Sequence, residues 1–197
     1  MHYTKTKIFN MTLKNLSVSV GIQNTNQTDK NTVVLNEFYE SAKDQVLKDY
    51  DWDFASTYRE LALTGNIPKN PKFLYEYDYP NDCLFAREII PYVDNNDIIE
   101  FEIASNNIGQ KVINTNQTPV VLRYTKCVDN ETFFSTEFVI ALSWYLSFLC
   151  ALALNKGCDY KQRCFITYNN LLKKMDCAEK EGFLNKNKNG NNWYDNL

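Results

Sequence analysis

The sequence predicts an α+β fold, in which a bundle of about four helices carries a small antiparallel β-sheet inserted between the second and third helices. Two observations predict this class. Apolar residues recur at helical spacing before residue 50 and after residue 135, whereas they alternate with a period of two in parts of residues 73–127. In addition, residues 138–154 form an uncharged apolar run, FVIALSWYLSFLCALAL. A helix that is apolar on every side needs partners all around it, so this run is expected to be the central helix of the core.

The apolar run is also close to the length of a membrane span. It falls short of the ~20 apolar residues that a span uses, contains Ser143 and Ser147, and lacks a flanking Lys/Arg asymmetry. We therefore interpret it as a core helix and expect no membrane partner. The order Asn155-Lys156-Gly157 is typical of a helix C-terminus, with a cation near the last carbonyls and a glycine that can adopt the left-handed conformation.

The remaining helices follow from apolar residues spaced three and four apart. Helices are expected over residues 5–18, 29–50, 135–155 and 158–178. Thr28 or Asp29 can cap the second helix, and the charged face of that helix, which includes Lys43, is expected to be solvated. We predict one domain over residues 1–181. Residues 182–197, rich in Asn, Lys and Gly, are expected to form a flexible tail.

The predicted sheet lies within residues 73–127. Over residues 73–79, four aromatic residues alternate with one leucine and two acids, and over 99–103 apolar residues alternate with two glutamates. A further strand is expected over 120–125, and another over 111–114 after a turn at 107–109, which makes three to five strands. Between residues 73 and 104 there are eight acids and one basic residue, Arg87; we expect the acids on the outer face. The acids are Glu76, Asp78, Asp82, Glu88, Asp94, Asp97, Glu100 and Glu102.

Composition excludes several classes of function. The net charge of -3 provides no basic field for tight, sequence-specific binding of nucleic acid. The six cysteines form no CxxC pair, which favours a reducing compartment without disulfides. The N-terminus lacks the continuous apolar segment of a signal peptide. The only histidine is His2, and no glycine-rich loop precedes Lys-Ser/Thr, so we predict no enzyme, no cofactor and no metal site.

Two large aromatic residues follow the second helix. We interpret Trp52 and Phe54 as side chains that close the end of the core; an aromatic platform for a sugar or a base is the alternative. The alternative function of the whole chain follows from this: a monomeric carbohydrate-binding or carbohydrate-active protein that uses Tyr and Trp faces and paired carboxylates.

The order of these segments resembles one known family. Phe38-Tyr39-x-x-Ala42-x-x-x-x-Leu47 leads into Trp52-x-Phe54-Ala55 and Leu61, and then come Tyr79-Pro80-x-Asp82-Cys83, Val120-x-Leu122-Arg123-Tyr124-Thr125 and an Ala/Leu-rich helix. This arrangement, over residues 8–177, resembles the tail tubular protein A family, the head-to-tail adaptors of short-tailed bacteriophages. A ring protein of a crAss-like phage would fit the same description.

The resemblance implies a structural protein of the virion, assembled in the host cytoplasm. It implies a ring of twelve copies that joins the portal protein to the tail tube or nozzle, and through which DNA is retained and ejected without sequence-specific binding. It implies no catalytic residue. The residues that carry it are mostly core positions: Trp52, Phe54, Ala55, Leu61, Tyr79, Pro80 and Tyr124.

Two further expectations concern contacts of such a ring. Asp94 and Asp97 are expected to face the DNA channel, because a negative wall repels phosphates and lets DNA slide. Trp193, Tyr194 and Leu197 end an otherwise polar tail, and aromatic residues of this kind are frequent interface anchors. We therefore expect the tail to become ordered on the portal or on an adjacent subunit.

Overall fold

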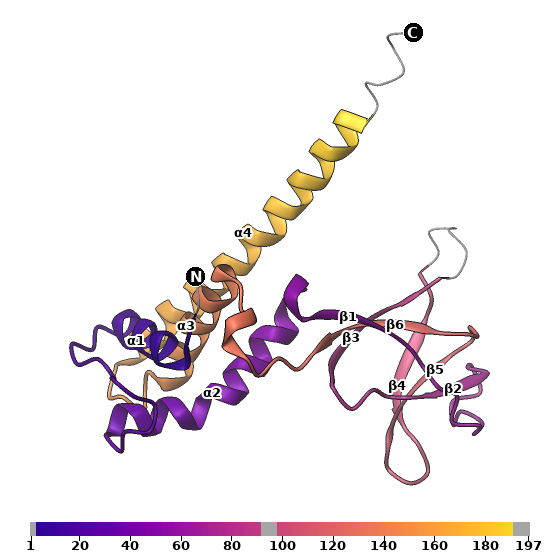
Figure 1. The fold of residues 1–197 in the computed structure, drawn as a ribbon, viewed down its shortest axis with the longest axis horizontal. Helices are drawn as coiled ribbons and strands as arrows, with labels where there is room; N and C mark the ends of the chain where they lie inside the picture. The colour runs from indigo at the N-terminus through magenta and orange to yellow at the C-terminus, as the bar shows by residue number, and fades with distance from the viewer. Residues whose placement is uncertain (1–2, 92–97, 191–197) are drawn as a thin grey trace. The chain divides into compact units, whose positions relative to one another are not determined.

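The chain divides into two compact units. The computed structural model describes residues 3–91 and 98–190, with side chains described as far as residue 178. Met1–Val46 and Phe134–Leu197 form one unit, here the helical unit, and Leu47–Phe133 form the other, the sheet unit (Figure 1). The fold class is α+β, as the sequence predicts. We expected one domain over residues 1–181; the inserted segment instead has a core of its own.

All four predicted helices are present, with shifted ends. They are α1 (Lys5–Asn15), α2 (Lys30–Asp49), α3 (Thr136–Cys150) and α4 (Cys158–Gly190). Asp29 caps α2, as one of the two predicted candidates: its carboxylate accepts hydrogen bonds from the backbone N–H of Asn31 and Thr32 and from the Thr32 hydroxyl. The Thr32 hydroxyl is the main reason why the pKa of Asp29 is lowered. Lys43 is not solvated as expected; it is 2% exposed and pairs with Glu40 at 2.7 Å.

Helix α3 is the centre of the helical unit. Its two serines contact α1: the Ser147 hydroxyl donates to the Thr12 carbonyl (3.2 Å), and the Asn15 amide donates to the Ser143 hydroxyl (3.2 Å). On its other side, aromatic rings pack against α4, with 4.9 Å between the centroids of Tyr145 and Tyr168. The predicted central helix is therefore confirmed as a core element with partners on more than one side. Within residues 3–91 and 98–190, no helix combines the length and the apolar character that a membrane span requires.

The ends of the last two helices differ from the expectation. Helix α3 ends at Cys150, five residues early, and Asn155 rather than Gly157 adopts the left-handed backbone, with φ of 58°. Helix α4 continues to Gly190, so residues 182–190, which the sequence assigned to a low-complexity polar tail, are helical. Residues such as Asn and Lys are tolerated in helices at small cost, and a continuing helix overrides the low-complexity signal. Among its described side chains, none beyond Tyr168 is fully buried.

The sheet unit contains two three-stranded antiparallel sheets. The strands are β1 (Ser56–Glu60), β2 (Tyr75–Asp78), β3 (Cys83–Ile90), β4 (Phe101–Ser105), β5 (Lys111–Thr115) and β6 (Val121–Lys126). The first sheet has the order β1-β6-β3 and the second the order β2-β5-β4. Two short 3-10 turns, Asp53–Ala55 and Glu131–Phe133, precede β1 and follow β6.

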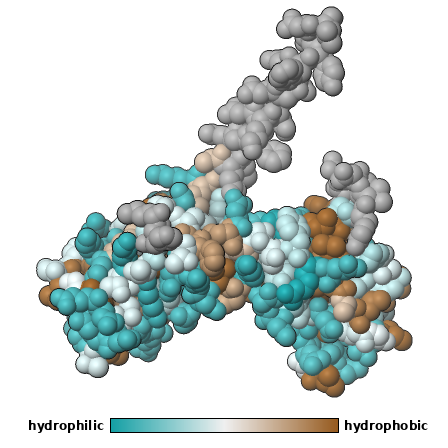
Figure 2. Space-filling model, viewed as in Figure 1, coloured by the Kyte–Doolittle hydropathy of each residue, from teal (hydrophilic) through white to brown (hydrophobic). Residues whose placement is uncertain are grey.

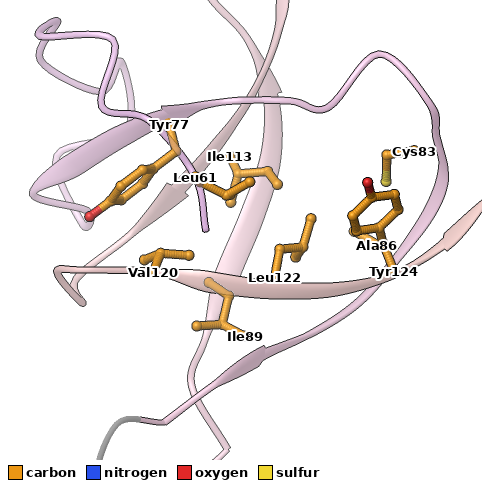
Figure 3. Close-up of a cluster of buried hydrophobic side chains, with 9 residues drawn as sticks. All are labelled: Leu61, Tyr77, Cys83, Ala86, Ile89, Ile113, Val120, Leu122 and Tyr124. Carbon is orange, nitrogen blue, oxygen red and sulfur yellow. The ribbon is translucent and has the colours of Figure 1, made fainter. Parts of the chain in front are cut away.

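Both sheets contribute to one hydrophobic core. Tyr77 and Ile113 come from the second sheet, whereas Ile89, Leu122 and Tyr124 come from the first (Figure 3). Leu61, Cys83, Ala86 and Val120 complete the cluster. This shared core explains why the inserted segment forms a unit by itself.

Two of the six strands were not predicted. β1 lies outside the expected region of 73–127, and its sequence, STYRE, has no apolar alternation. β3 pairs with β6 through two register shifts, between Cys83 and Phe85 and between Ala86 and Glu88. Such bulges interrupt the two-residue period on which the prediction depends.

Candidate functional site

A groove on the sheet unit brings together several residues of the family resemblance. It is a cavity of about 760 Å³ at the end of β1, the end of β2 and the start of β5. Its lining residues are Arg59, Glu60, Leu61, Ala62, Asp78, Tyr79, Pro80, Asn81, Cys83, Gln110 and Lys111. Of the seven resemblance residues, Leu61, Tyr79 and Pro80 therefore lie together at one groove.

The floor of the groove is apolar. Leu61 and Cys83 are 8% and 9% exposed, and Pro80, in the loop between β2 and β3, is also buried. Tyr79 is half-buried, and the ammonium of Lys111 lies 4.2 Å from the centroid of its ring. A cation over an aromatic face is attractive and leaves the charge accessible to a partner.

Arg59, one of the residues that line the groove, forms an ion pair with Asp82, and a tyrosine fixes this pair. Two nitrogens of Arg59 contact the Asp82 carboxylate, at 3.2 and 3.4 Å, and the Tyr124 hydroxyl donates to the same carboxylate at 3.0 Å. Burial, and next the bond to Asp82, raises the pKa of Tyr124 to about 12. Tyr124 therefore stays protonated and holds Asp82 beside Arg59.

The thiol at the groove is not an activated nucleophile. Burial raises the pKa of Cys83. This effect of burial is larger than the opposing effect of the hydrogen bond that the Cys83 sulfur accepts from the Tyr79 hydroxyl. Burial also raises the pKa of Tyr79 above its ordinary value. Reactive cysteines have a lowered pKa, so Cys83 does not have the character of an activated thiol.

A second polar cluster joins the end of α2 to the first sheet. One guanidinium nitrogen of Arg87, on β3, donates to the carbonyls of Leu47, Lys48 and Tyr50 at 3.2, 3.0 and 2.7 Å. These are the carbonyls that a helix end leaves without partners. Burial lowers the pKa of Arg87, and nearby Asp51 opposes that effect.

Arg123 completes this cluster. Two of its nitrogens contact the same oxygen of Asp51 at 2.6 Å, and its Nε donates to Glu88 at 2.6 Å. The hydrogen bond to Asp51 is the main cause of a raised pKa of Arg123. The sequence marked Arg87 as the lone cation among acids, but nothing local indicates that its partners lie about 40 residues upstream.

The aromatic residues after α2 belong mainly to the core. Trp52 is 3% exposed and packs against Tyr50, with 4.8 Å between ring centroids; Ala55 is fully buried and Phe54 is half-buried. Trp52 therefore closes the core, as we interpreted, and does not form a platform.

The acidic residues do not all face outward as expected. Glu76 is 3% exposed, because Thr64 and Asn66 from the preceding loop donate hydrogen bonds to its carboxylate. Three others are neutralised by cations outside the acidic segment, in the pairs Asp82–Arg59, Glu88–Arg123 and Glu100–Lys72. The charge asymmetry counted along the sequence is therefore much smaller in space.

The other predicted contact residues are not placed. Asp94, Asp97, Trp193, Tyr194 and Leu197 lie outside the described residues. In the part of the chain that the structure describes, no group of three or more His, Cys, Asp or Glu side chains is arranged to hold a metal ion.

No model of a known protein family matches the sequence, and no curated protein matches it.

Proposed function

We propose that this chain is a structural virion protein: a head-to-tail adaptor that forms a ring between the portal and the tail tube or nozzle of a short-tailed phage. The observation that carries the proposal is the surface of the sheet unit. Fourteen large apolar residues are exposed in the described chain, and nine of them belong to this unit. They are Tyr58, Leu63, Ile67, Leu74, Phe85, Ile98, Ile103, Ile108 and Phe133.

The distribution of these residues fits a ring subunit. Figure 2 shows apolar residues in several separate patches on the sheet unit rather than in one binding pocket. In a closed ring, each copy contacts its two neighbours through two different surfaces. Exposed apolar residues on opposite edges of a unit are what such contacts use, and larger apolar exposure commonly marks an interaction surface.

The groove supports the same proposal. Leu61, Tyr79 and Pro80, which contribute to the family resemblance, line a shallow site with the accessible cations Arg59 and Lys111. Its chemistry suits a protein partner that offers an aromatic or acidic side chain. We propose the portal, the tail tube and neighbouring copies as the partners, and twelve copies as the number in the ring.

The carbohydrate-binding alternative has less support. Sugar binding by stacking needs open aromatic faces. Trp52, Tyr77 and Tyr124 are 3%, 1% and 1% exposed, and Tyr58, at 62%, is the most exposed tyrosine among the described residues. The carboxylates of Asp82, Glu88 and Glu100 are occupied by cations. This is why we favour an adaptor over a sugar-binding protein.

Two parts of the proposal rest on the sequence alone. Asp94 and Asp97 are proposed to face the DNA channel, and Trp193, Tyr194 and Leu197 to anchor the tail on the portal or a neighbour. Deleting residues 185–197 is expected to lower adaptor occupancy on DNA-filled heads and to weaken DNA retention; unchanged values of both would exclude the anchor.

The proposal is tested by mass in solution, with and without the portal of the same phage. We expect rings, or a monomer that joins the portal ring with twelve chains of 23.0 kDa each. A stable dimer closed by a two-fold interface, with no binding to the portal, would overturn the proposal.

A further inference from the structure

One face of the second sheet carries a row of three polar residues. Glu76 on β2 and Glu102 on β4 are both direct partners of Asn114 on the middle strand, β5. Directly opposed residues project from the same face of a sheet, so the amide lies between the two carboxylates. Glu76 is 3% exposed and Asn114 is 1% exposed.

The hydrogen-bond donors around these carboxylates are neutral. Thr64 and Asn66 donate to Glu76 Oε1 at 2.8 and 3.1 Å. Asn70 donates to Glu102 Oε1 at 3.3 Å, and Asn114 Nδ2 donates to Glu102 Oε2 at 3.2 Å. Neither glutamate forms an ion pair with any described residue. A buried carboxylate without a counter-charge is unfavourable, so the layer has an excess of negative charge.

An unpaired oxygen lies within the same layer. The side-chain oxygen of Asn114, Oδ1, is buried and has no hydrogen-bond partner among the described residues. Exchanging the amide oxygen and nitrogen would place an oxygen against the Glu102 carboxylate, so the orientation is set by the bond from Nδ2. A buried polar atom without a partner requires an explanation, and a bound ion is one that also answers the charge excess.

We propose that this layer binds a divalent cation, with Ca²⁺ as the preferred ion. The ligands are Asn114 Oδ1 and the carboxylates of Glu76 and Glu102, completed by water. Ca²⁺ takes six to eight oxygen ligands, which include carboxylates, Asn carbonyls and waters, in flexible geometry, whereas Mg²⁺ demands a near-ideal octahedron. Hydrogen-bonded carboxylate oxygens keep further acceptor capacity, so the existing bonds do not block coordination.

A cavity lies beside one of the three proposed ligands. Glu76, but not Asn114 or Glu102, lines a space of about 160 Å³ together with Asn66, Ile67, Lys69 and the loop 106–108, so room for water is shown on the Glu76 side of the layer. Lys69 in this cavity donates to the Asn106 carbonyl at 3.1 Å. The ion would link the loop 64–70 to all three strands of the sheet and stabilise the sheet unit. This inference does not depend on the adaptor function.

The test uses the full chain, freed of metal by chelation, with CaCl₂ as the probe and matched NaCl as the ionic-strength control. We expect calorimetric binding with a Kd of about 0.1 to 1 mM. Ca²⁺ at 10 mM should raise Tm by about 3 to 6 °C, and MgCl₂ should raise it less.

Charge-removing variants locate the site. Glu102→Gln and Glu76→Gln should each weaken Ca²⁺ binding at least tenfold, by the general rule that ligand charge sets the affinity of such sites. Glu100→Gln is the matched control. Glu100 directly precedes β4, is exposed and pairs with Lys72, so this variant should keep the Ca²⁺ response. If Ca²⁺ has no effect on the unaltered chain, the proposal is overturned; this is the result expected if an ordered water, and not an ion, satisfies Asn114 Oδ1. A Ca²⁺ effect that persists in Glu102→Gln overturns it as well.

Discussion

The two units of this protein are stabilised by different kinds of contact. In the helical unit, α3 buries Phe138, Val139, Leu142 and Leu146 completely, and its polar contacts with α1 are hydrogen bonds that uncharged side chains of serine, threonine and asparagine make with one another or with backbone carbonyls. In the sheet unit, a small apolar core is surrounded by ion pairs between residues that are far apart in the sequence.

The difference indicates that the two units have different roles. The helical unit has a fully buried apolar core around α3, whereas nine of the fourteen exposed large apolar side chains of the described chain lie in the sheet unit, beside accessible charges. Interfaces combine these two features, with an apolar centre and a polar rim. We therefore expect the helical unit to serve as the rigid body and the sheet unit to contribute a large part of the contacts in an assembly.

The largest effect on stability is expected in the helical unit. Leu142→Ala should reduce the free energy of unfolding by about 2 to 5 kcal/mol, because it leaves a cavity around a fully buried position. Leu152→Ala, at a position that is 49% exposed, is the control and should change little. Urea denaturation measures both variants. Similar losses of free energy of unfolding for the two would contradict a fully buried core around α3.

The next effect concerns the polar cluster of the sheet unit. Arg87→Ala should cost about 1.5 to 3 kcal/mol, because three carbonyls lose a charged donor. Arg87→Lys should recover only part of this, since an ammonium cannot reproduce the guanidinium geometry.

The matched control for Arg87 is Arg59→Ala. Its ion pair with Asp82 is solvent-exposed and should contribute about 1 kcal/mol or less. If Arg87→Ala and Arg59→Ala reduced the free energy of unfolding equally in the same denaturation experiment, the buried contacts of Arg87 would contribute no more to stability than an exposed ion pair.

A smaller effect is expected from alkaline pH. The folded state raises the pKa of Tyr124 to about 12 from 10.0, chiefly through burial. The stabilisation that this shift represents is present below pH 10 and is lost as the pH rises toward 12, because the unfolded chain releases the proton first. Tyr124→Phe should therefore reduce the fall in stability of the sheet unit between pH 9.5 and 11. An unchanged pH dependence would mean that Tyr124 does not titrate differently in the two states.

The smallest effect on stability is expected at the exposed apolar positions. Ile67→Ser combined with Ile108→Ser should alter the free energy of unfolding by about 0.5 kcal/mol or less per site, because these side chains are 90% and 77% exposed. The same variant should weaken ring formation or portal binding, measured by co-sedimentation. Ile166→Ser, in the helical unit, is the control that should leave assembly intact. If Ile166→Ser weakened assembly and the double variant did not, the interface would lie on the helical unit.

The helical unit was largely predictable because its signals are local. Apolar residues three and four apart, a capping Asp29 and the uncharged run before Leu154 are all visible within a few turns of chain. The end of α4 was missed, because composition alone suggested a tail where the helix continues to Gly190.

The sheet unit was less predictable because its contacts are not local. The alternating strands were recognised, but the bulged β3 and the polar β1 lack the period of two. Glu76 was placed outward by alternation, although Thr64 and Asn66 satisfy it in the interior. Likewise, the resemblance named Tyr79 and Pro80 as mostly core positions and predicted no groove; only the folded arrangement brings them together with Arg59 and Lys111.

We expect the sheet unit to form a large part of the contacts in an assembly. Hydrogen exchange, measured by mass spectrometry on the free chain and on the assembled ring, tests this expectation most directly. We predict that assembly slows exchange mainly in the sheet unit, in β1, β4 and the segments around Ile67 and Ile108, whose apolar side chains are exposed in the single chain. Exchange within α3 should be slow in both states. Slower exchange confined to the helical unit, with residues 56–133 unchanged, would contradict the account.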